Sequence, residues 1–213
     1  MAVILVNSFI SSNELKAQTA NALNFDGAND YVEISPLIPY SSNFTFECWV
    51  KTSASSATIL GMGNPVINGY VLFGLQTGNI RLAIGNGTSI DQLDGNTNLN
   101  NNAWHHIAVV KSGSSVTFYL DGNVDATAST SLSPATITRT TLGAGFFNNI
   151  LQSFTSMSID EFRIWNVART QAEIQNNKSC ELNAQPGLVT AYHFNHGVAG
   201  GTNTGVTSLT DAS

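Results

Sequence analysis

Residues 43–51 alternate strictly between two kinds of side chain, and this alternation most limits what the chain can fold into. Successive side chains of a β-strand point to opposite faces, so a period of two predicts a strand whose two faces meet different surroundings. One face carries Phe44, Phe46, Cys48 and Val50, and the other carries Thr45, Glu47, Trp49 and Lys51.

Similar short segments follow from residue 20 onward, separated by turn sequences such as Asp121-Gly122-Asn123. About a dozen of them recur at intervals of roughly 8–12 residues, which is typical of an antiparallel sandwich or barrel. The one candidate helix is 170–177, where Thr170 and Glu173 have the spacing of a capping box. The predicted strands are 21–25, 30–34, 43–51, 57–61, 69–75, 79–84, 105–111, 115–121, 123–128, 138–143, 156–166 and 188–194.

The composition excludes several classes of partner. Gly, Asn, Ser and Thr account for 85 of the 213 residues, which favours turns and short strands over helices. The net charge is −6, with only eight Lys and Arg residues. Because nucleic-acid affinity depends mostly on Lys and Arg, we expect no nucleic-acid partner. No apolar run approaches the ~18 residues that a membrane span requires, so we expect no membrane insertion.

The two cysteines, Cys48 and Cys180, are too few for a disulfide scaffold. The sequence is equally compatible with one bridge between an early strand and a late segment and with two free thiols. Residues 1–18 form a poor signal peptide, because their apolar stretch is short and no Lys or Arg precedes it. We interpret them as the remnant of a processed leader or as a segment appended during cloning. The Asn-, Thr- and Ser-rich remainder is typical of a secreted or cell-surface protein.

Three motifs, in this order, resemble a known family: 25–32 (FDGANDYV), 102–110 with 118–122 (NAWHHIAVV and FYLDG), and 159–166 (IDEFRIWN) followed by Arg169 and Glu173. They resemble the laminin-G-like, concanavalin-A-like lectin/glucanase domains of secreted bacterial proteins. The resemblance implies one all-β, antiparallel jelly-roll sandwich over 19–196. Residues 197–213 then form an irregular tail, a last strand or a linker to a further domain.

The resemblance also implies a calcium site. Calcium takes six to eight oxygen ligands, and a Gly-containing turn of Asp and Asn residues offers both carboxylates and backbone carbonyls. The resemblance matches Asp26 and Asp160 to acidic ligands of the family, and Asn29 and Asp30 are further candidates. The alternative is a hydrogen-bonded turn in which the Asp side chains accept from nearby backbone N–H groups.

A sugar-binding surface has two candidate locations. The first is the polar and aromatic face of two predicted strands, with Glu47 and Trp49 on one and Arg163 and Trp165 on the other. A flat indole is a good platform for a pyranose, but the same residues can instead form cross-strand ion pairs and pack under loops. The second is the aromatic loop Phe146, Phe147, Asn148 and Asn149, because loops often carry binding residues.

We therefore expect a non-catalytic, calcium-stabilised carbohydrate-binding or adhesion module of a larger secreted or cell-surface protein. Its partner would be a polysaccharide or glycan, and other domains of the parent protein are further candidates. A glycoside hydrolase or lyase is the first alternative. Against it, the chain lacks the Glu-x-Asp-x-x-Glu run that aims three acids of one strand at a common cleft. A purely structural interaction module is the second alternative.

Overall fold

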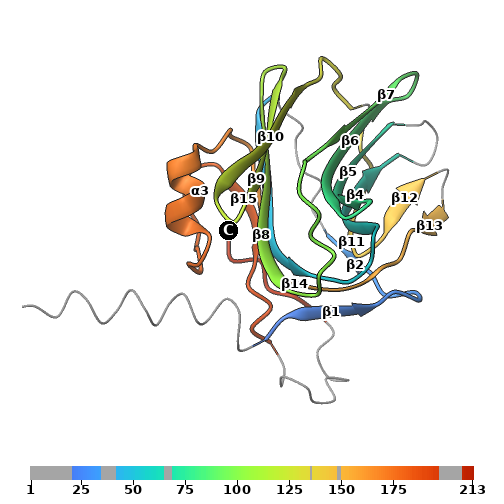
Figure 1. Ribbon diagram of the computed structural model, residues 1–213. Coiled ribbons are helices and arrows are strands. Elements are labelled where there is room, and N and C mark those ends of the chain that lie inside the picture. The colour runs from blue at the N-terminus through green and yellow to red at the C-terminus, as the bar shows by residue number, and fades with distance from the viewer. Residues whose placement is uncertain (1–20, 35–41, 65–68, 135, 148–149, 197–207) are drawn as a thin grey trace, which may run out of the picture.

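Two antiparallel β-sheets face each other across an apolar core in the computed structural model (Figure 1), which confirms the predicted sandwich. The structure describes residues 21–34, 42–64, 69–134, 136–147, 150–196 and 208–213. The predicted leader remnant, 1–18, lies outside these residues. Within them, no helix is long and apolar enough to cross a membrane.

The first sheet has seven strands, and the long strand β14 lies near one of its edges. β14 pairs with β3 on one side, and with both β1 and β15 on the other. The order along the main path is β1 (Leu23–Asp26), β14 (Ser156–Trp165), β3 (Phe44–Lys51), β8 (Trp104–Ser112), β9 (Ser115–Leu120) and β10 (Asn123–Ser129), with β15 (Leu188–Tyr192) off this path.

The second sheet has six strands, and a small hairpin lies beside it (Figure 1). The order is β2 (Val32–Glu33), β11 (Arg139–Leu142), β4 (Ala57–Gly63), β5 (Gly69–Gln76), β6 (Asn79–Asn86) and β7 (Ile90–Asp94). The hairpin consists of β12 (Gly145–Phe147) and β13 (Ile150–Gln152).

Each of the dozen predicted strands is present, with ends that differ by a few residues, and three short strands escaped prediction. Strand β7 is only five residues long and its sequence, IDQLD, does not alternate strictly between apolar and polar residues. Strands β12 and β13 are each three residues long. The predicted helix is α3 (Gln171–Asn177), and its capping box is complete. Glu173 N donates to Thr170 Oγ1 over 3.3 Å, and Thr170 N donates to Glu173 Oε2 over 2.7 Å.

The inward faces of the two sheets form one apolar core. The seven-stranded sheet contributes Phe46 and Cys48, and the six-stranded sheet contributes Phe73 and Leu82. All four are at most 2% exposed. The apolar face predicted for 43–51 is therefore the core face, and its polar face looks outward from the sandwich.

Two glycines of β4 let the β12–β13 hairpin lie directly against the outer side of the six-stranded sheet. A Cβ atom at Gly61 would lie 2.4 Å from Ala144 O, and one at Gly63 would lie 2.5 Å from Phe146 O. No real Cβ makes contacts this short, so any side chain at these positions would push the hairpin away. Because Gly61 and Gly63 have no side chains, the hairpin can lie over β4 and beside β5.

The described end of the chain closes a sheet edge. Ala212 N donates to Ala191 O and Ala191 N donates to Asp211 Oδ1, both over 2.9 Å, so residues 208–213 cover the free edge of β15 without forming a regular strand. The two cysteines are free thiols. Cys48 is in the core, whereas Cys180 follows α3 on the outer side of the same sheet. The sheet thus separates the two thiols, and the alternative of a disulfide does not hold.

Candidate functional site

The polar face of β3 and β14, predicted as a sugar-binding surface, is covered. Helix α3 and the segment after it lie over the outer side of the seven-stranded sheet (Figure 1). Glu47, Trp49, Arg163 and Trp165 are all at most 4% exposed. The prediction of a sugar platform is wrong for these four residues, because the helix that follows β14 folds back onto them. The alternative of cross-strand ion pairs and packed tryptophans describes them correctly.

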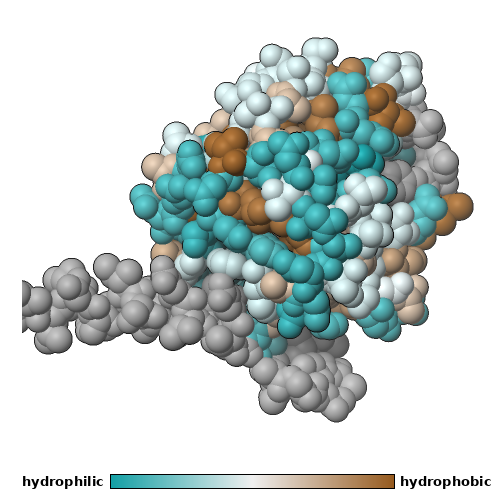
Figure 2. All heavy atoms as spheres, viewed as in Figure 1, coloured by the Kyte–Doolittle hydropathy of each residue, from teal (hydrophilic) through white to brown (hydrophobic). Residues whose placement is uncertain are grey.

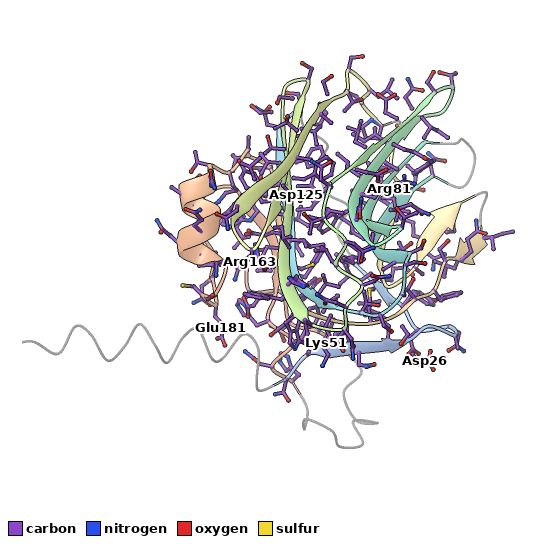
Figure 3. The ribbon with its side chains drawn as sticks, in the orientation of Figure 1. Asp26, Lys51, Arg81, Asp125, Arg163 and Glu181 are labelled. Atoms are coloured by element: carbon purple, nitrogen blue, oxygen red, sulfur yellow. The ribbon has the colours of Figure 1, made fainter. Side chains whose placement is uncertain are left out.

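Arg163 is the centre of this buried polar cluster. Its guanidinium lies 2.8 Å from Glu161 Oε2 and 3.5 Å from Glu47 Oε1. It also donates to the backbone oxygens of Asn177 and Cys180, which end α3 and begin the segment after it. Figure 3 shows Arg163 between the sheet and α3. One side chain therefore joins two strands to the covering segment.

The two tryptophans are also held by the sheet and by the segments that flank α3. Trp49 Nε1 donates to Lys178 O over 2.7 Å, and Trp165 Nε1 donates to Glu47 Oε1 over 2.8 Å. The Arg169 guanidinium stacks 3.9 Å from the centroid of the Trp165 ring, a cation–π contact. Neither indole ring offers a face to a ligand.

Three ionisable groups of this cluster, Asp160, His106 and His193, have shifted pKa values. Burial raises the pKa of Asp160 to about 8, and the neighbouring carboxylate of Glu161 adds to the effect. Burial lowers the pKa of His106 to about 4, so this imidazole is neutral. A hydrogen bond with Glu161 raises the pKa of His193. Glu161 itself has a positive φ of 48°, where β14 shifts register against β3.

The four predicted calcium ligands do not come together. Asp26, Asn29 and Asp30 share one turn, but the register pairs Asp26 with Ser156, four residues from Asp160 along β14. At ~3.3 Å per residue the two backbones are ~13 Å apart, too far for both side chains to reach one ion. Figure 3 likewise places Asp26 far from the Arg163 cluster.

The turn at 26–30 is closed by hydrogen bonds instead. Ala28 N donates to Asp26 Oδ1 over 2.7 Å, and Asp26 N donates to Asp30 Oδ2 over 3.0 Å. Among the described residues, no group of three or more His, Cys, Asp or Glu side chains can hold a metal ion. The four residues predicted from the resemblance therefore do not meet around one ion, and hydrogen bonds account for the geometry of the turn at 26–30.

The predicted loop 146–149 begins within strand β12 of the β12–β13 hairpin. Phe146 is 5% exposed, and its ring lies 4.9 Å from the Arg139 guanidinium, so it is a packing residue rather than a ligand contact. Phe147 belongs to β12. Asn148 and Asn149 lie outside the described residues, and their predicted role stays a prediction. The hairpin nevertheless borders the second sheet, which carries a different candidate site.

The outer side of β5, β6 and β7 carries a group of polar and aromatic side chains that could bind a ligand. We call this group the β5–β7 face. It consists of Tyr70, Arg81, Gln92 and Asp94. The Arg81 guanidinium makes two bonds of 2.6 Å to Asp94 and one of 3.3 Å to Gln92. Figure 3 shows Arg81 on this sheet, on the side of the sandwich opposite α3. The Arg81 guanidinium is fixed in one orientation because its pairing with Asp94 is bidentate.

Tyr70 reaches across β6 to this group. Tyr70 is on β5 and Gln92 is on β7, and a hydrogen bond joins their side chains. Between them β6 presents only Ala83 and Gly85. Burial raises the pKa of Tyr70, against the opposing effects of Gln92 and of the Arg81 charge. The half-buried Tyr70 side chain therefore reaches Gln92 across the short side chains of β6.

The sequence analysis missed this face. The signal was present, because Tyr70 and Leu72 alternate with core residues in 69–75, as Arg81 and Ala83 do in 79–84. What hid it was β7, which was not predicted and which supplies Gln92 and Asp94. The charged pair exists only once β7 joins β6.

Seen from the side of Figure 1, hydrophilic residues dominate the surface, with smaller apolar patches between them (Figure 2).

Comparison with known proteins agrees with this architecture. The solved structure of a putative carbohydrate-binding protein from Bacteroides ovatus matches with a TM-score of 0.66 and 19% identity, over 82% of this chain and 51% of that one. The LG1-3 region of the laminin alpha2 chain matches with a TM-score of 0.57 and 17% identity, over 68% and 31%. A SAP-like pentraxin from Limulus polyphemus matches with a TM-score of 0.58 and 14% identity, over 73% and 80%.

At these identities the matches show the fold alone. The chain spans about half the length of the Bacteroides protein. A search of curated protein sequences found no match. A family profile described as the concanavalin A-like lectin/glucanases superfamily, of the laminin G type, matches residues 26–175. The chain belongs to this superfamily.

Proposed function

We propose that this chain is a non-catalytic carbohydrate-binding or adhesion module of a larger secreted or cell-surface protein, and that its ligand binds on the β5–β7 face. The observation that carries the proposal is the arrangement of Tyr70 beside Arg81, Gln92 and Asp94 on an outer sheet face. It combines a flat apolar ring with polar groups held in fixed directions, as small-ligand sites do.

The chemistry of the face suits a sugar. The Tyr70 ring would supply an aromatic contact to the apolar side of a pyranose. Arg81 uses three of its five N–H groups in the bonds to Asp94 and Gln92, which leaves two for sugar hydroxyl oxygens. Asp94 and Gln92 would accept hydrogen bonds from neighbouring hydroxyls. Because these groups already hold one another, little side-chain entropy is lost on binding.

The fold-level comparisons support the proposal in a general way. The superfamily includes lectins, and one structural neighbour is described as a putative carbohydrate-binding protein. That neighbour is about twice as long as the part matched here, which supports the interpretation of this chain as one module of a larger protein. The secreted or cell-surface location rests on composition alone.

The placement of the acids supports a non-catalytic role. Glycoside hydrolysis needs two carboxyl groups on either side of the bond to be cleaved, both within reach of the substrate. Glu47, Asp160 and Glu161 are each at most 2% exposed beneath α3 and the segment after it. Asp94, on the proposed face, is held by Arg81.

Native affinity electrophoresis in gels that contain soluble polysaccharides tests the proposal. We expect at least one polymer to retard the wild-type chain, and Tyr70→Ala to abolish the retardation. Tyr31→Ala is the matched control, since Tyr31 is an exposed tyrosine beside Arg139 that precedes β2, at the sheet edge opposite β7. Retardation that survives Tyr70→Ala would place the ligand elsewhere, and new reducing ends in the incubated polymer would contradict the non-catalytic role.

A further inference from the structure

Every cation described on the outer side of the six-stranded sheet is paired with a carboxylate. Arg81 is bound to Asp94 through two bonds of 2.6 Å. Arg139, on β11, lies 3.0 Å from Glu33 on β2. The remaining Lys and Arg side chains of the described chain belong to the seven-stranded sheet or to α3 and its flanks: Lys51, Lys111, Arg163, Arg169 and Lys178.

Arg139 is held even more firmly than its ion pair indicates. Its guanidinium lies 5.8 Å from the Tyr31 ring centroid and 4.9 Å from that of Phe146. A guanidinium between two rings and a carboxylate is bound on several sides by the protein itself. It would have to leave these partners to meet an anionic ligand.

The consequence is a polar face with no net charge on a protein of net charge −6. A uronate, sulfate or sialate group would have to displace Asp94 from Arg81, or be buried beside a carboxylate with no cation of its own. The overall negative charge would also slow the approach of an acidic polymer. Sugar hydroxyl groups meet neither obstacle, because they can bind to Arg81, Asp94 and Gln92 while the Arg81–Asp94 ion pair stays intact.

We infer that the β5–β7 face selects uncharged pyranose polymers and rejects acidic ones. The inference rests on the proposed function and names its ligand class. The selecting element is Asp94: it neutralises Arg81, and its carboxylate repels an incoming anion.

Matched polymers test this inference directly. An acidic polysaccharide such as polygalacturonate or alginate is compared with its carboxyl-reduced form, alongside a panel of neutral glucans, mannans and galactans. We expect a dissociation constant at least about tenfold lower for the neutral form of a bound polymer. We also expect this constant to change less than about twofold between about 50 mM and about 500 mM NaCl, because no ion pair with the ligand is screened.

Asp94→Asn is the decisive variant. It releases the charge of Arg81, so binding of the acidic polymer should appear at about 50 mM NaCl and weaken as salt is added. Glu181→Gln removes the same charge from the opposite side of the molecule (Figure 3) and should leave selectivity unchanged. Thermal melting of each variant establishes that it is folded.

Two results would overturn the inference, and they differ. If the wild type binds the acidic form more tightly, with a strong salt dependence, the selectivity is wrong while carbohydrate binding stands. If no polymer of either kind is bound, the proposed function falls, and the inference falls with it.

Discussion

His193 Nδ1 lies 2.9 Å from Glu161 Oε2 and 3.0 Å from Glu161 Oε1, so one imidazole faces both oxygens of a buried carboxylate. The pair joins β14 to the residue that follows β15. It belongs to the cluster around Arg163, which fixes the cover over the seven-stranded sheet. The energetics of this cluster can be measured without any ligand.

His193→Gln should destabilise the protein more in acid than in base. The hydrogen bond with Glu161 raises the pKa of His193 above its ordinary value of 6.5. Its stabilisation is therefore complete below pH ~6.5 and is lost as the pH rises through the higher folded-state value. We expect a loss of about 1–3 kcal/mol at pH 6, and a smaller one at pH 9, from urea unfolding. Equal losses at both values would show that His193 is neutral throughout.

Asp160→Asn should have the opposite pH dependence. Because burial raises the pKa of Asp160 from 3.8 to about 8, the carboxyl is protonated in the folded state at neutral pH. The stability that this acid contributes is greatest below pH ~4 and falls as the pH rises toward 8. Asparagine keeps an acceptor for Glu161 N and has no proton to lose. We expect the variant to equal the wild type near pH 4 and to exceed it by more than about 1 kcal/mol at pH 8.

A less stable Asp160→Asn at pH 8 would contradict this account. It would mean that Asp160 is ionised and paired with a cation in the folded protein. Repeating the measurement with a chelator would then show whether the cation is a metal ion.

Arg163→Met should be the most damaging single change in the cluster. It leaves the buried carboxylates of Glu47 and Glu161 without their shared cation, a loss of about 3–5 kcal/mol. It also removes the donor to the carbonyls of Asn177 and Cys180. Amide exchange in 178–187 should therefore accelerate more than exchange in β4 and β5. Uniform acceleration throughout the chain would show only a general loss of stability.

Two substitutions at Asp26 distinguish a hydrogen-bonded turn at 26–30 from a calcium site. If Asp26 only accepts from Ala28 N, then Asp26→Asn keeps that bond and Asp26→Ala loses it, with a cost of about 1 kcal/mol. Neither result should depend on calcium or on a chelator. If calcium raises the melting temperature of the wild type, and both variants abolish the rise, this turn binds the ion after all.

The sequence alone determined the architecture because the signals for strands and for the helix start lie in short, local stretches of sequence. Alternation in 43–51 and in its neighbours gives the strands, and Thr170 with Glu173 gives the start of α3. The same alternation correctly divided 43–51 into a core face and a polar face.

Only the tertiary structure decided which polar face is open. Glu47 and Arg163 alternate with apolar residues along their strands as Arg81 does, but α3 folds over the first two and leaves Arg81 uncovered. Register decided the rest: it separates Asp26 from Asp160 by four positions and places Arg81 opposite Asp94. Burial and pairing across strands depend on where distant segments meet in space, and periodicity within one strand contains no information about that.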